Sequence, residues 1–436
     1  MIFEKVTLEN FGVYRGRHTV AFGPLRPKTP IIHFKGADGH GKITLVAALL
    51  LGLHGRFACC SKRSGLPYHQ YLARVMFCGS RLQEWAGLVL VFSSKFKGGM
   101  HCFQVQRRWF HSGEGVREEV VVSLDGSVDQ GLSREWDRYG REIVRPELLD
   151  LFLWDGERLE EIAGDVTQFL KAAVWGAMGI AVVDRLRENL CALAKVSQLE
   201  LSSPGRPSHA IGPSAGDAEG VAGFVGGGQK SRKGARVAGG KGKQALPERT
   251  LKKMVEGKFR AEELGRVLKG AKHIAGLMDV LRQRMVENYI QRLMVFVHTS
   301  FQAIVGKRGL INKLSIDPRS LELSLFDGDG CAVAREDLSE AEWKVLAAAI
   351  GWGVAGISEH RLPWIIDLPL ERLGPFGEGL FSEQHSPFAN HQTILFSTDR
   401  DTDLVFHDGI QSRVGCTYNL GQDALGLASV IRAVVE

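Results

Sequence analysis

A glycine-rich loop between an apolar strand and an apolar helix constrains this sequence more than any other feature. Residues 31–34 (IIHF) favour a strand, residues 36–42 (GADGHGK) form the loop, and residues 45–53 are apolar apart from one glycine. The loop has the Walker A spacing, G-x-x-x-x-G-K, in which backbone N–H groups and the N-terminus of the following helix hold phosphate oxygens. The pattern predicts an α/β fold that binds the phosphates of ATP. The residues expected to hold them are Gly36, Gly39, Gly41 and Lys42.

The residue after Lys42 departs from this motif. Ser or Thr normally stands there, and its hydroxyl ligates Mg²⁺. This sequence has Ile43, which carries no side-chain oxygen. Thr44 or a water must then supply the missing ligand, and a glycine-rich turn without any ligand stays open as an alternative.

Two apolar strands that end in polar residues lie in the second half of the chain. Residues 363–367 (PWIID) place Asp367 at the end of a buried strand. An acid in that place is typical of a Walker B element, where it holds Mg²⁺ directly or through water. Residues 393–399 (TILFSTD) form a further strand that ends in a polar cluster.

Ser339 precedes a helix expected over residues 338–357, and Glu342 follows three residues later. This is the spacing of a capping box, in which the two side chains bond to backbone N–H groups of the first helical turn. A helix cap explains these residues on their own, whereas the position of Ser339 ahead of the Asp367 strand favours a role in the nucleotide site.

The composition is that of a globular protein. Of the 436 residues, 44% are hydrophobic and 24% are charged, which excludes collagenous and wholly disordered chains. No apolar run reaches the roughly 18 residues that a membrane helix needs. The seven cysteines are scattered and the N-terminus has no secretory pattern, so we expect a cytoplasmic protein without membrane contact.

The chain divides into two α/β halves separated by a helical excursion. Apolar residues recur at helical spacing over residues 166–201 and again over residues 248–305. We expect these helices to pair as a short antiparallel stalk and the two halves to form one head domain. The expected boundaries are 1–175 for the first half, 176–201 and 248–305 for the stalk helices, 202–247 for a linker and 306–436 for the second half.

Residues 202–247 contain twelve glycines and few large apolar side chains. Such a segment cannot bury enough surface to offset its ordering entropy, so we expect a flexible linker. Between Gly205 and Lys243 it carries seven Lys or Arg and two Asp or Glu, a local charge of +5 against +6 for the whole chain. These charges could contact DNA phosphates; a solvated basic linker explains them equally well.

In the order and sequence of these elements the chain resembles the heads of SMC-like ABC ATPases, and most of all the DndD family of bacterial DNA sulfur (phosphorothioate) modification. The resemblance covers about residues 1–200 and 250–436. The segments that carry it are 1–16 (MIFEKVTLENFGVYRG), 36–44, 151–163 (LFLWDGERLEEIA), 338–353 (LSEAEWKVLAAAIGWG), 365–373 (IIDLPLERL) and 394–399.

The resemblance implies a P-loop ATPase head that uses ATP and Mg²⁺, with Thr44 beside the loop glycines and Lys42 in the nucleotide site. Asp155 and Glu157 would lie where the family's Q-loop senses Mg²⁺ or the γ-phosphate, and Asp367 would be the Walker B acid. Ser339 would be the signature serine, which contacts the ATP bound by the other subunit of a head homodimer. Three further residues would lie near the base of the nucleotide: Asn10, Arg15 and Arg17.

The chain departs from the family at several motif positions. Ile43 replaces the metal-binding hydroxyl, and Ala341 replaces the signature glycine. Leu368 stands where many ABC ATPases have a catalytic Glu, Gly374 replaces the D-loop acid and Thr398 the switch histidine. The family's long coiled coil is missing. The absence of the hydroxyl and of the D-loop acid predicts weak hydrolysis or none.

We therefore expect an ATPase head that acts with DNA and other sulfur-modification proteins in DNA phosphorothioation or a linked restriction system. Two alternatives stay open. One is a non-hydrolysing scaffold subunit that binds nucleotide or DNA. The other is a DNA-repair ATPase of the RecF or RecN type, against which the segments 155–157 (DGE) and 365–373 argue.

Overall fold

The computed structural model describes most of both halves of the chain. The chain forms two compact units. The head unit contains Met1–Ala181 and Gln283–Glu436, and the stalk unit contains Val182–Arg282. The described residues are 1–23, 28–60, 64–76, 85–112, 115–177, 180–202, 248–305, 311–358, 360–367, 391–398 and 411–434. Residues 203–247 of the expected linker, Leu368 and Gly374 lie outside these ranges. In the described part of the chain, no helix has the length and apolar character needed to span a membrane.

A twelve-stranded sheet organises the head unit. Its order is β7-β6-β5-β4-β1-β2-β15-β14-β3-β13-β12-β8. The strands of the first half are β1 (Ile2–Phe11), β2 (Tyr14–Ala21), β3 (Ile31–Lys35), β4 (Trp85–Phe96), β5 (Gly99–Ser112), β6 (Gly115–Leu124), β7 (Ser127–Val128) and β8 (Leu153–Asp155). Those of the second half are β12 (Trp364–Asp367), β13 (Thr393–Ser397), β14 (Val414–Gln422) and β15 (Ser429–Val434). Because β3 pairs parallel with both β13 and β14, the two halves form one α/β head, as expected.

Strand β3 is central and parallel, which explains its uninterrupted apolar sequence. Ile31, Ile32 and Phe34 are all buried. The Phe34 ring stacks on Phe396 of β13 and on Tyr418 of β14, with 5.1 Å between ring centroids in each case. Aromatic stacking therefore joins the two halves directly beneath the glycine loop.

A second joint between the halves is the buried side chain of Gln392. Its Oε1 accepts a hydrogen bond from Phe3 N at 2.8 Å, and its Nε2 donates to Phe3 O at 2.7 Å. One amide thus satisfies both backbone groups of a residue in β1, where the register between β1 and β4 shifts. This pair of bonds ties the start of the chain to the segment that enters β13.

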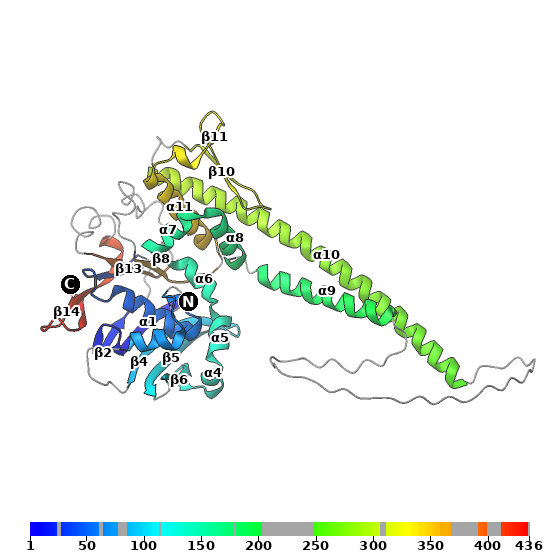
Figure 1. Cartoon of the computed structure of the whole chain (residues 1–436), viewed down its shortest axis with the longest axis horizontal. Helices are drawn as coiled ribbons and strands as arrows, with labels where there is room; N and C mark the ends of the chain where they lie inside the picture. The colour runs from blue at the N-terminus through cyan, green and yellow to red at the C-terminus, as the bar shows by residue number, and fades with distance from the viewer. Residues whose placement is uncertain are drawn as a thin grey trace, which may run out of the picture. The chain divides into compact units, whose positions relative to one another are not determined.

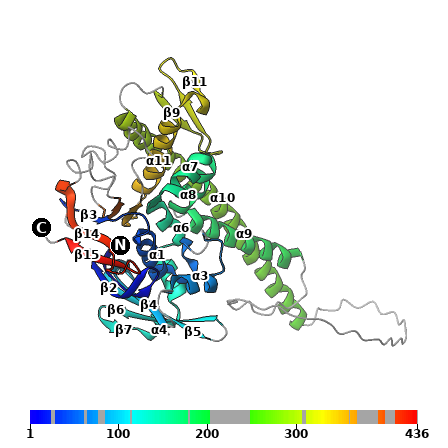
Figure 2. The same cartoon turned by 60° about the vertical axis from the view of Figure 1, so that its left-hand side comes forward.

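The helices of the head unit form two groups. Helix α1 (Lys42–His54) packs on β1, β4 and β5, and α5 (Trp136–Ile143) lies beside it. Helices α7 (Gly156–Gly164), α8 (Val166–Ala177) and α11 (Glu340–Gly356) form the other group, as Figure 1 and Figure 2 show. The remaining short helices are η1 (Gly55–Phe57), α3 (Tyr68–Val75), α4 (Gln130–Arg134), α6 (Pro146–Leu149), η2 (Asp150–Phe152), η3 (Arg335–Asp337) and η6 (Gln411–Arg413).

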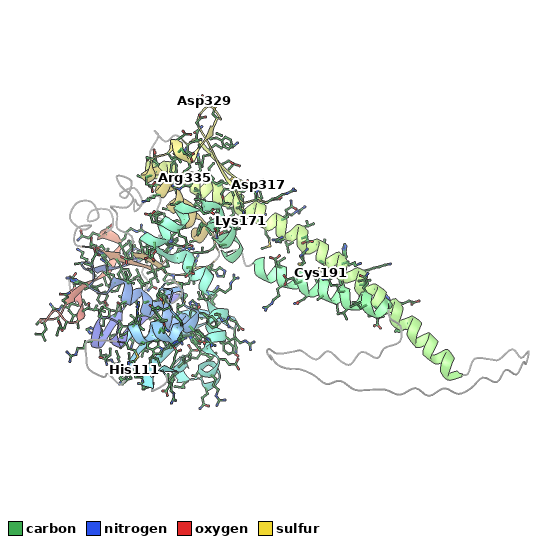
Figure 3. The ribbon with its side chains drawn as sticks, viewed as in Figure 1. His111, Lys171, Cys191, Asp317, Asp329 and Arg335 are labelled. Atoms are coloured by element: carbon green, nitrogen blue, oxygen red, sulfur yellow. The ribbon has the colours of Figure 1, made fainter. Side chains whose placement is uncertain are left out.

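A small three-stranded sheet precedes α11. It contains β9 (Lys313–Ile316), β10 (Leu323–Phe326) and β11 (Ala332–Val333), in the order β11-β10-β9. Asp329 lies in its β10–β11 turn and Arg335 follows β11 (Figure 3). The Arg335 guanidinium lies over the Trp343 ring of α11, 5.2 Å from its centroid, and so connects this sheet to the helix.

The stalk unit is an antiparallel pair of helices formed by most of α9 (Ile180–Ser202), which carries the Cys191 labelled in Figure 3, and the first part of α10 (Glu248–Val305). Among the described residues, two ion pairs cross between them, Arg187–Asp279 at 2.6 Å and Asp184–Arg282 at 3.2 Å. Each helix thus contributes one Asp and one Arg three residues apart. The most buried side chains of the unit are small: Ala194, Ser197, Ala271 and Ala275.

The end of α10 belongs to the head unit rather than to the stalk. Tyr289 donates a hydrogen bond to Val354 O of α11 at 2.7 Å. A Cβ on Gly353 would lie only 2.7 Å from Leu293 of α10, so glycine permits this close approach. The expected stalk helix 248–305 is therefore shared between the units, and the expected boundary after residue 175 falls inside α8.

Candidate functional site: a glycine loop at the carboxyl edge of the sheet

The glycine loop connects β3 to α1 in a conformation that requires glycine at its end. Gly41 is the N-cap of α1 and has φ 97° and ψ 11°, a left-handed conformation. A Cβ at this position would also lie 2.6 Å from the Tyr14 hydroxyl. That hydroxyl donates to Gly41 O at 3.1 Å, and burial raises the pKa of Tyr14, which keeps the phenol protonated as a donor. The β1–β2 turn thus fixes the end of the loop.

The strands on both sides of β3 hold the rest of the loop. Gly36 N donates to Ser397 O of β13 at 3.1 Å. On the other side, His40 Nδ1 lies 3.1 Å from Leu420 O of β14, which can only accept, so this nitrogen carries the proton. A Cβ on Gly36 would lie 2.8 Å from Leu420 Cβ. The loop therefore takes its shape from strands of the second half of the chain.

Lys42 ends the loop and begins α1, and only 9% of its side chain is exposed. Its ammonium donates to Gly36 O at 2.9 Å and contacts Asp38 Oδ1 at 3.3 Å. The helix that follows has no acidic residue in its first turn. A buried cation, turned toward the loop at a helix N-terminus, is suited to bind an anion.

The two residues after Lys42 have different environments: Ile43 faces solvent and Thr44 packs against the β1–β2 turn. Ile43 is 77% exposed, an unusual environment for this side chain. Thr44 packs against Gly12 in the β1–β2 turn so closely that no Cβ would fit on Gly12. If the Thr44 hydroxyl is to ligate Mg²⁺ in place of the missing hydroxyl at residue 43, it must do so from beneath this turn.

Two carboxylates lie at the same edge of the sheet as the loop. Asp367 is the last residue of β12 and Asp155 the last residue of β8, and the two pair directly in the parallel ladder. Strands β3, β13, β12 and β8 are neighbours in that order and run parallel, so their carboxyl ends share one edge. With about 4.8 Å between strands, Asp367 lies roughly 10 Å from β3. Ligands of open α/β sheets bind at this edge.

Asp155 and Glu157 begin helix α7. Asp155 is its N-cap, and Oδ1 accepts a hydrogen bond from Arg158 N at 2.8 Å. Glu157 is exposed in the first turn. The cap explains locally why the chain turns from β8 into a helix at this point.

These residues provide a partial ligand set for Mg²⁺. Carboxylates and phosphate oxygens are the ligands that Mg²⁺ prefers, and Asp155 and Asp367 lie side by side at the loop's edge of the sheet. Among the residues that the structure describes, no cluster of three or more His, Cys, Asp and Glu could hold a metal without help from a bound group. The set fits a Mg²⁺ that also binds phosphate, but Ile43 cannot ligate it.

Ser339 lies away from the glycine loop of its own chain. It caps α11, which packs on α7 and α8 rather than with α1 (Figure 1). The capping box is complete: Glu342 N donates to Ser339 Oγ at 3.3 Å, and Ser339 N donates to Glu342 Oε2 at 3.0 Å. The following Ala341 is half-buried.

The three residues expected near the base shape the β1–β2 turn. Asn10 has φ 50°, and its Oδ1 accepts a hydrogen bond from Gly16 N at 2.8 Å. Arg17 Nε lies 3.5 Å from a carboxylate oxygen of Glu9, and Arg15 is exposed. The contacts of Asn10 and Arg17 are therefore local to the hairpin that touches Gly41 and Thr44.

Sequence reasoning missed three residues that build the loop: Tyr14, Asp38 and Leu420. The contact of Asp38 with Lys42 had a local signal, because the two residues are four positions apart across the start of a helix. Tyr14 and Leu420 had none, since their roles depend on distant strand pairing.

The structure is similar to solved SMC heads. It aligns with the Smc head domain of Pyrococcus furiosus, solved with an extended coiled coil and bound to the C-terminal domain of ScpA, at a TM-score of 0.65. That match covers 99% of this chain and 96% of that chain at 12% identity. The chain has the fold of an SMC head domain, which is an ABC-type ATPase fold.

Two further SMC heads give weaker matches. A SmcHead bound to the C-winged helix domain of ScpA has a TM-score of 0.50 at 12% identity, over 100% of this chain and 98% of that chain. The SMC head domain from Thermotoga maritima has a TM-score of 0.47 at 10% identity, over 100% of both chains. No protein-family model and no curated protein matches the sequence.

Proposed function

We propose that this SMC-type head binds ATP on residues 36–42 and acts as a homodimer of heads around two nucleotides. The observation that carries the proposal is the buried Lys42 side chain, whose ammonium turns back to donate to Gly36 O at the start of the glycine loop. Asp367 lies at the same edge of the sheet, two strands away. A cation and a carboxylate at one edge of the sheet support this proposal, because a Mg²⁺-bound triphosphate needs both.

In this proposal each part of the site has one task. The loop N–H groups and Lys42 hold the β and γ phosphates, while Asp155 and Asp367 hold Mg²⁺ directly or through water. Ser339 acts from the second head, because in its own chain it lies in the other helix group. Mg²⁺ would supply charge neutralisation of the phosphates during transfer to water.

The proposal includes weak hydrolysis. Ile43 gives Mg²⁺ no hydroxyl ligand, and Gly374 gives no D-loop acid. Loss of about 3 kcal/mol of transition-state stabilisation lowers turnover by roughly two decades. A non-hydrolysing scaffold is the second candidate, favoured by the 77% exposure of Ile43 at the position of the missing hydroxyl.

The biological setting that we propose is DNA phosphorothioate modification or a linked restriction system, with DNA and other sulfur-modification proteins as partners. Its support is the sequence of residues 151–163 and 365–373. Deleting the gene from its native host should then remove phosphorothioate linkages from genomic DNA, measured by mass spectrometry of nuclease digests, or abolish restriction linked to them. An unchanged phosphorothioate content together with unchanged restriction would contradict this setting.

The nucleotide proposal is tested by ATP binding and turnover of three proteins: the wild type, Lys42→Ala and Ile43→Thr. We expect the wild type to bind ATP, Lys42→Ala to lose binding, and Ile43→Thr to hydrolyse ATP faster than the wild type. Lys171→Ala is the matched control, because Lys171 is exposed on α8 (Figure 3). Absence of ATP binding in the wild type and in Ile43→Thr would exclude a working nucleotide site.

Binding with equal turnover in the wild type and Ile43→Thr would instead favour the scaffold. Mg²⁺ gives a second readout, because a phosphate cradle without a metal hydroxyl depends less on the ion. ATP affinity of the wild type should therefore change less on removal of Mg²⁺ than the affinity of Ile43→Thr.

A further inference from the structure

The glycine loop contains an acidic residue that contacts its own lysine. Asp38 Oδ1 lies 3.3 Å from Lys42 Nζ, within the same loop. The Lys42 side chain is 9% exposed, whereas the Asp38 side chain is 95% exposed. One partner of this ion pair is therefore fixed in the protein and the other is free to move into solvent.

The Asp38 carboxylate contacts the ammonium that an anionic ligand of the loop would use. The Lys42 ammonium has three donors; one bonds to Gly36 O and another to Asp38. A phosphate that binds the loop needs the same ammonium. It would replace the carboxylate, because two anions that share one cation repel each other.

We propose that Asp38 is an internal counter-ion of Lys42, which a bound polyphosphate must displace, so that Asp38 sets the affinity and the charge preference of the loop. The inference rests on the proposed nucleotide binding. In the absence of ligand the carboxylate neutralises the buried ammonium. When ligand binds, Asp38 turns outward and remains near the phosphates, where its charge weakens binding, more for a triphosphate than for a diphosphate.

The test is the substitution Asp38→Asn, which removes the charge and keeps the size of the side chain. We expect ATP to bind about fivefold more tightly to this variant than to the wild type, from one screened charge repulsion near the surface. The gain should be smaller for ADP, and it should shrink at high salt because exposed charges are screened. Calorimetric titration with ATP and ADP at low and high salt measures all three effects.

The matched control is Glu119→Gln, which removes one carboxylate from an exposed ion pair with Arg117 on β6. It changes the net charge equally and should leave ATP affinity unchanged. An Asp38→Asn variant that binds ATP no more tightly than the wild type overturns the inference. A Mg²⁺-dependent loss of affinity in Asp38→Asn also overturns it, because the carboxylate would then serve the metal.

These outcomes separate the inference from the proposed function. If the wild type binds ATP and Asp38→Asn shows no gain, only the counter-ion role fails. If neither protein binds ATP or ADP, nucleotide binding itself fails, and the counter-ion role fails with it. Unfolding curves show whether Asp38→Asn is folded, and any loss of stability should be small because the Asp38 side chain is 95% exposed.

Discussion

Asp155 and Asp367 lie directly opposite each other at the ends of the neighbouring parallel strands β8 and β12. The first comes from the first half of the chain and the second from the other half, so the acid pair exists only in the folded head. Asp155 Oδ1 also accepts a hydrogen bond from Arg158 N, which holds its carboxylate at the start of α7. Under the proposed function, Asp155 and Asp367 are the two carboxylates that would hold the Mg²⁺ of the bound nucleotide.

Asp155 has both a structural and a proposed metal role, and two substitutions separate them. Asp155→Ala removes the N-cap of α7 and should lower the free energy of unfolding by about 1 kcal/mol, whereas Asp155→Asn keeps a good cap. Both variants should weaken ATP binding in the presence of Mg²⁺. Urea unfolding and ATP titration measure the two effects. Unchanged Mg²⁺-dependent binding in Asp155→Asn would show that the carboxylate serves only as a cap.

Two substitutions also separate the helix-capping role of Ser339 from its proposed role at the nucleotide of a second head. Asn caps helices as well as Ser does, so Ser339→Asn should preserve the stability of α11, whereas Ser339→Ala should cost about 1 kcal/mol. If Ser339 reaches the nucleotide of a second head, Ser339→Asn lowers ATP turnover of the dimer at unchanged stability. Equal turnover in Ser339→Asn and the wild type would leave the cap as the whole role of this residue.

The loop glycines are not equivalent, and this can be measured by comparing two alanine variants. Gly39 and Gly41 both have positive φ, 83° and 97°. A Cβ on Gly39 meets no atom within 4 Å, whereas one on Gly41 collides with Tyr14. Gly39→Ala should cost about 1 kcal/mol for the backbone alone, and Gly41→Ala should cost clearly more and lose ATP binding. Equal losses of unfolding free energy in the two variants would mean that the β1–β2 turn shifts to make room for the new Cβ.

Gln392 should be among the most sensitive polar residues of the head. Gln392→Leu leaves the N–H and C=O of Phe3 buried without this partner, so we expect a loss of about 3 kcal/mol in the free energy of unfolding. Gln283→Leu is the control, because Gln283 bonds to Glu287 on the exposed face of α10 and should change stability little. If Gln392→Leu changes the free energy of unfolding only slightly, water must take over the hydrogen bonds to Phe3 N and Phe3 O.

The two ion pairs of the stalk unit set the register of α9 against α10. Reversing the charge of Asp184 or of Arg282 alone should destabilise the helix pair by about 0.5 kcal/mol, because the partners are partly exposed. Reversing both should restore most of the loss. A double-mutant cycle on thermal unfolding measures the coupling, and additive effects of the two reversals would show that this pair contributes nothing to register.

The loop and its flanking elements could be predicted from the sequence because their determinants are local. The apolar residues of β3, the glycine spacing and the apolar helix stand within residues 31–54. The cap at Ser339 was predictable for the same reason, since Glu342 follows within one helical turn. Strand β12 was visible as a short apolar run that ends in an acid.

Strands β8, β14 and β15 could not be predicted in this way. β14 contains two glycines and several polar residues, and it is a strand because it pairs with β3 on one side and β15 on the other. β8 has three residues, too few for a periodic pattern. The register that places Asp155 opposite Asp367 depends on this pairing, which a single sequence does not reveal.

The position of β3 between β13 and β14 has a consequence for the order in which the protein is made. Residues 31–42 leave the ribosome long before residues 393–422, which supply the carbonyl groups that hold Gly36 and His40. An emerging chain therefore has the glycine loop without its support until residues 393–422 have also been made. Such long-range pairing also slows folding. A chain cut before residue 393 has the complete glycine loop but none of the carbonyl groups that hold it in shape.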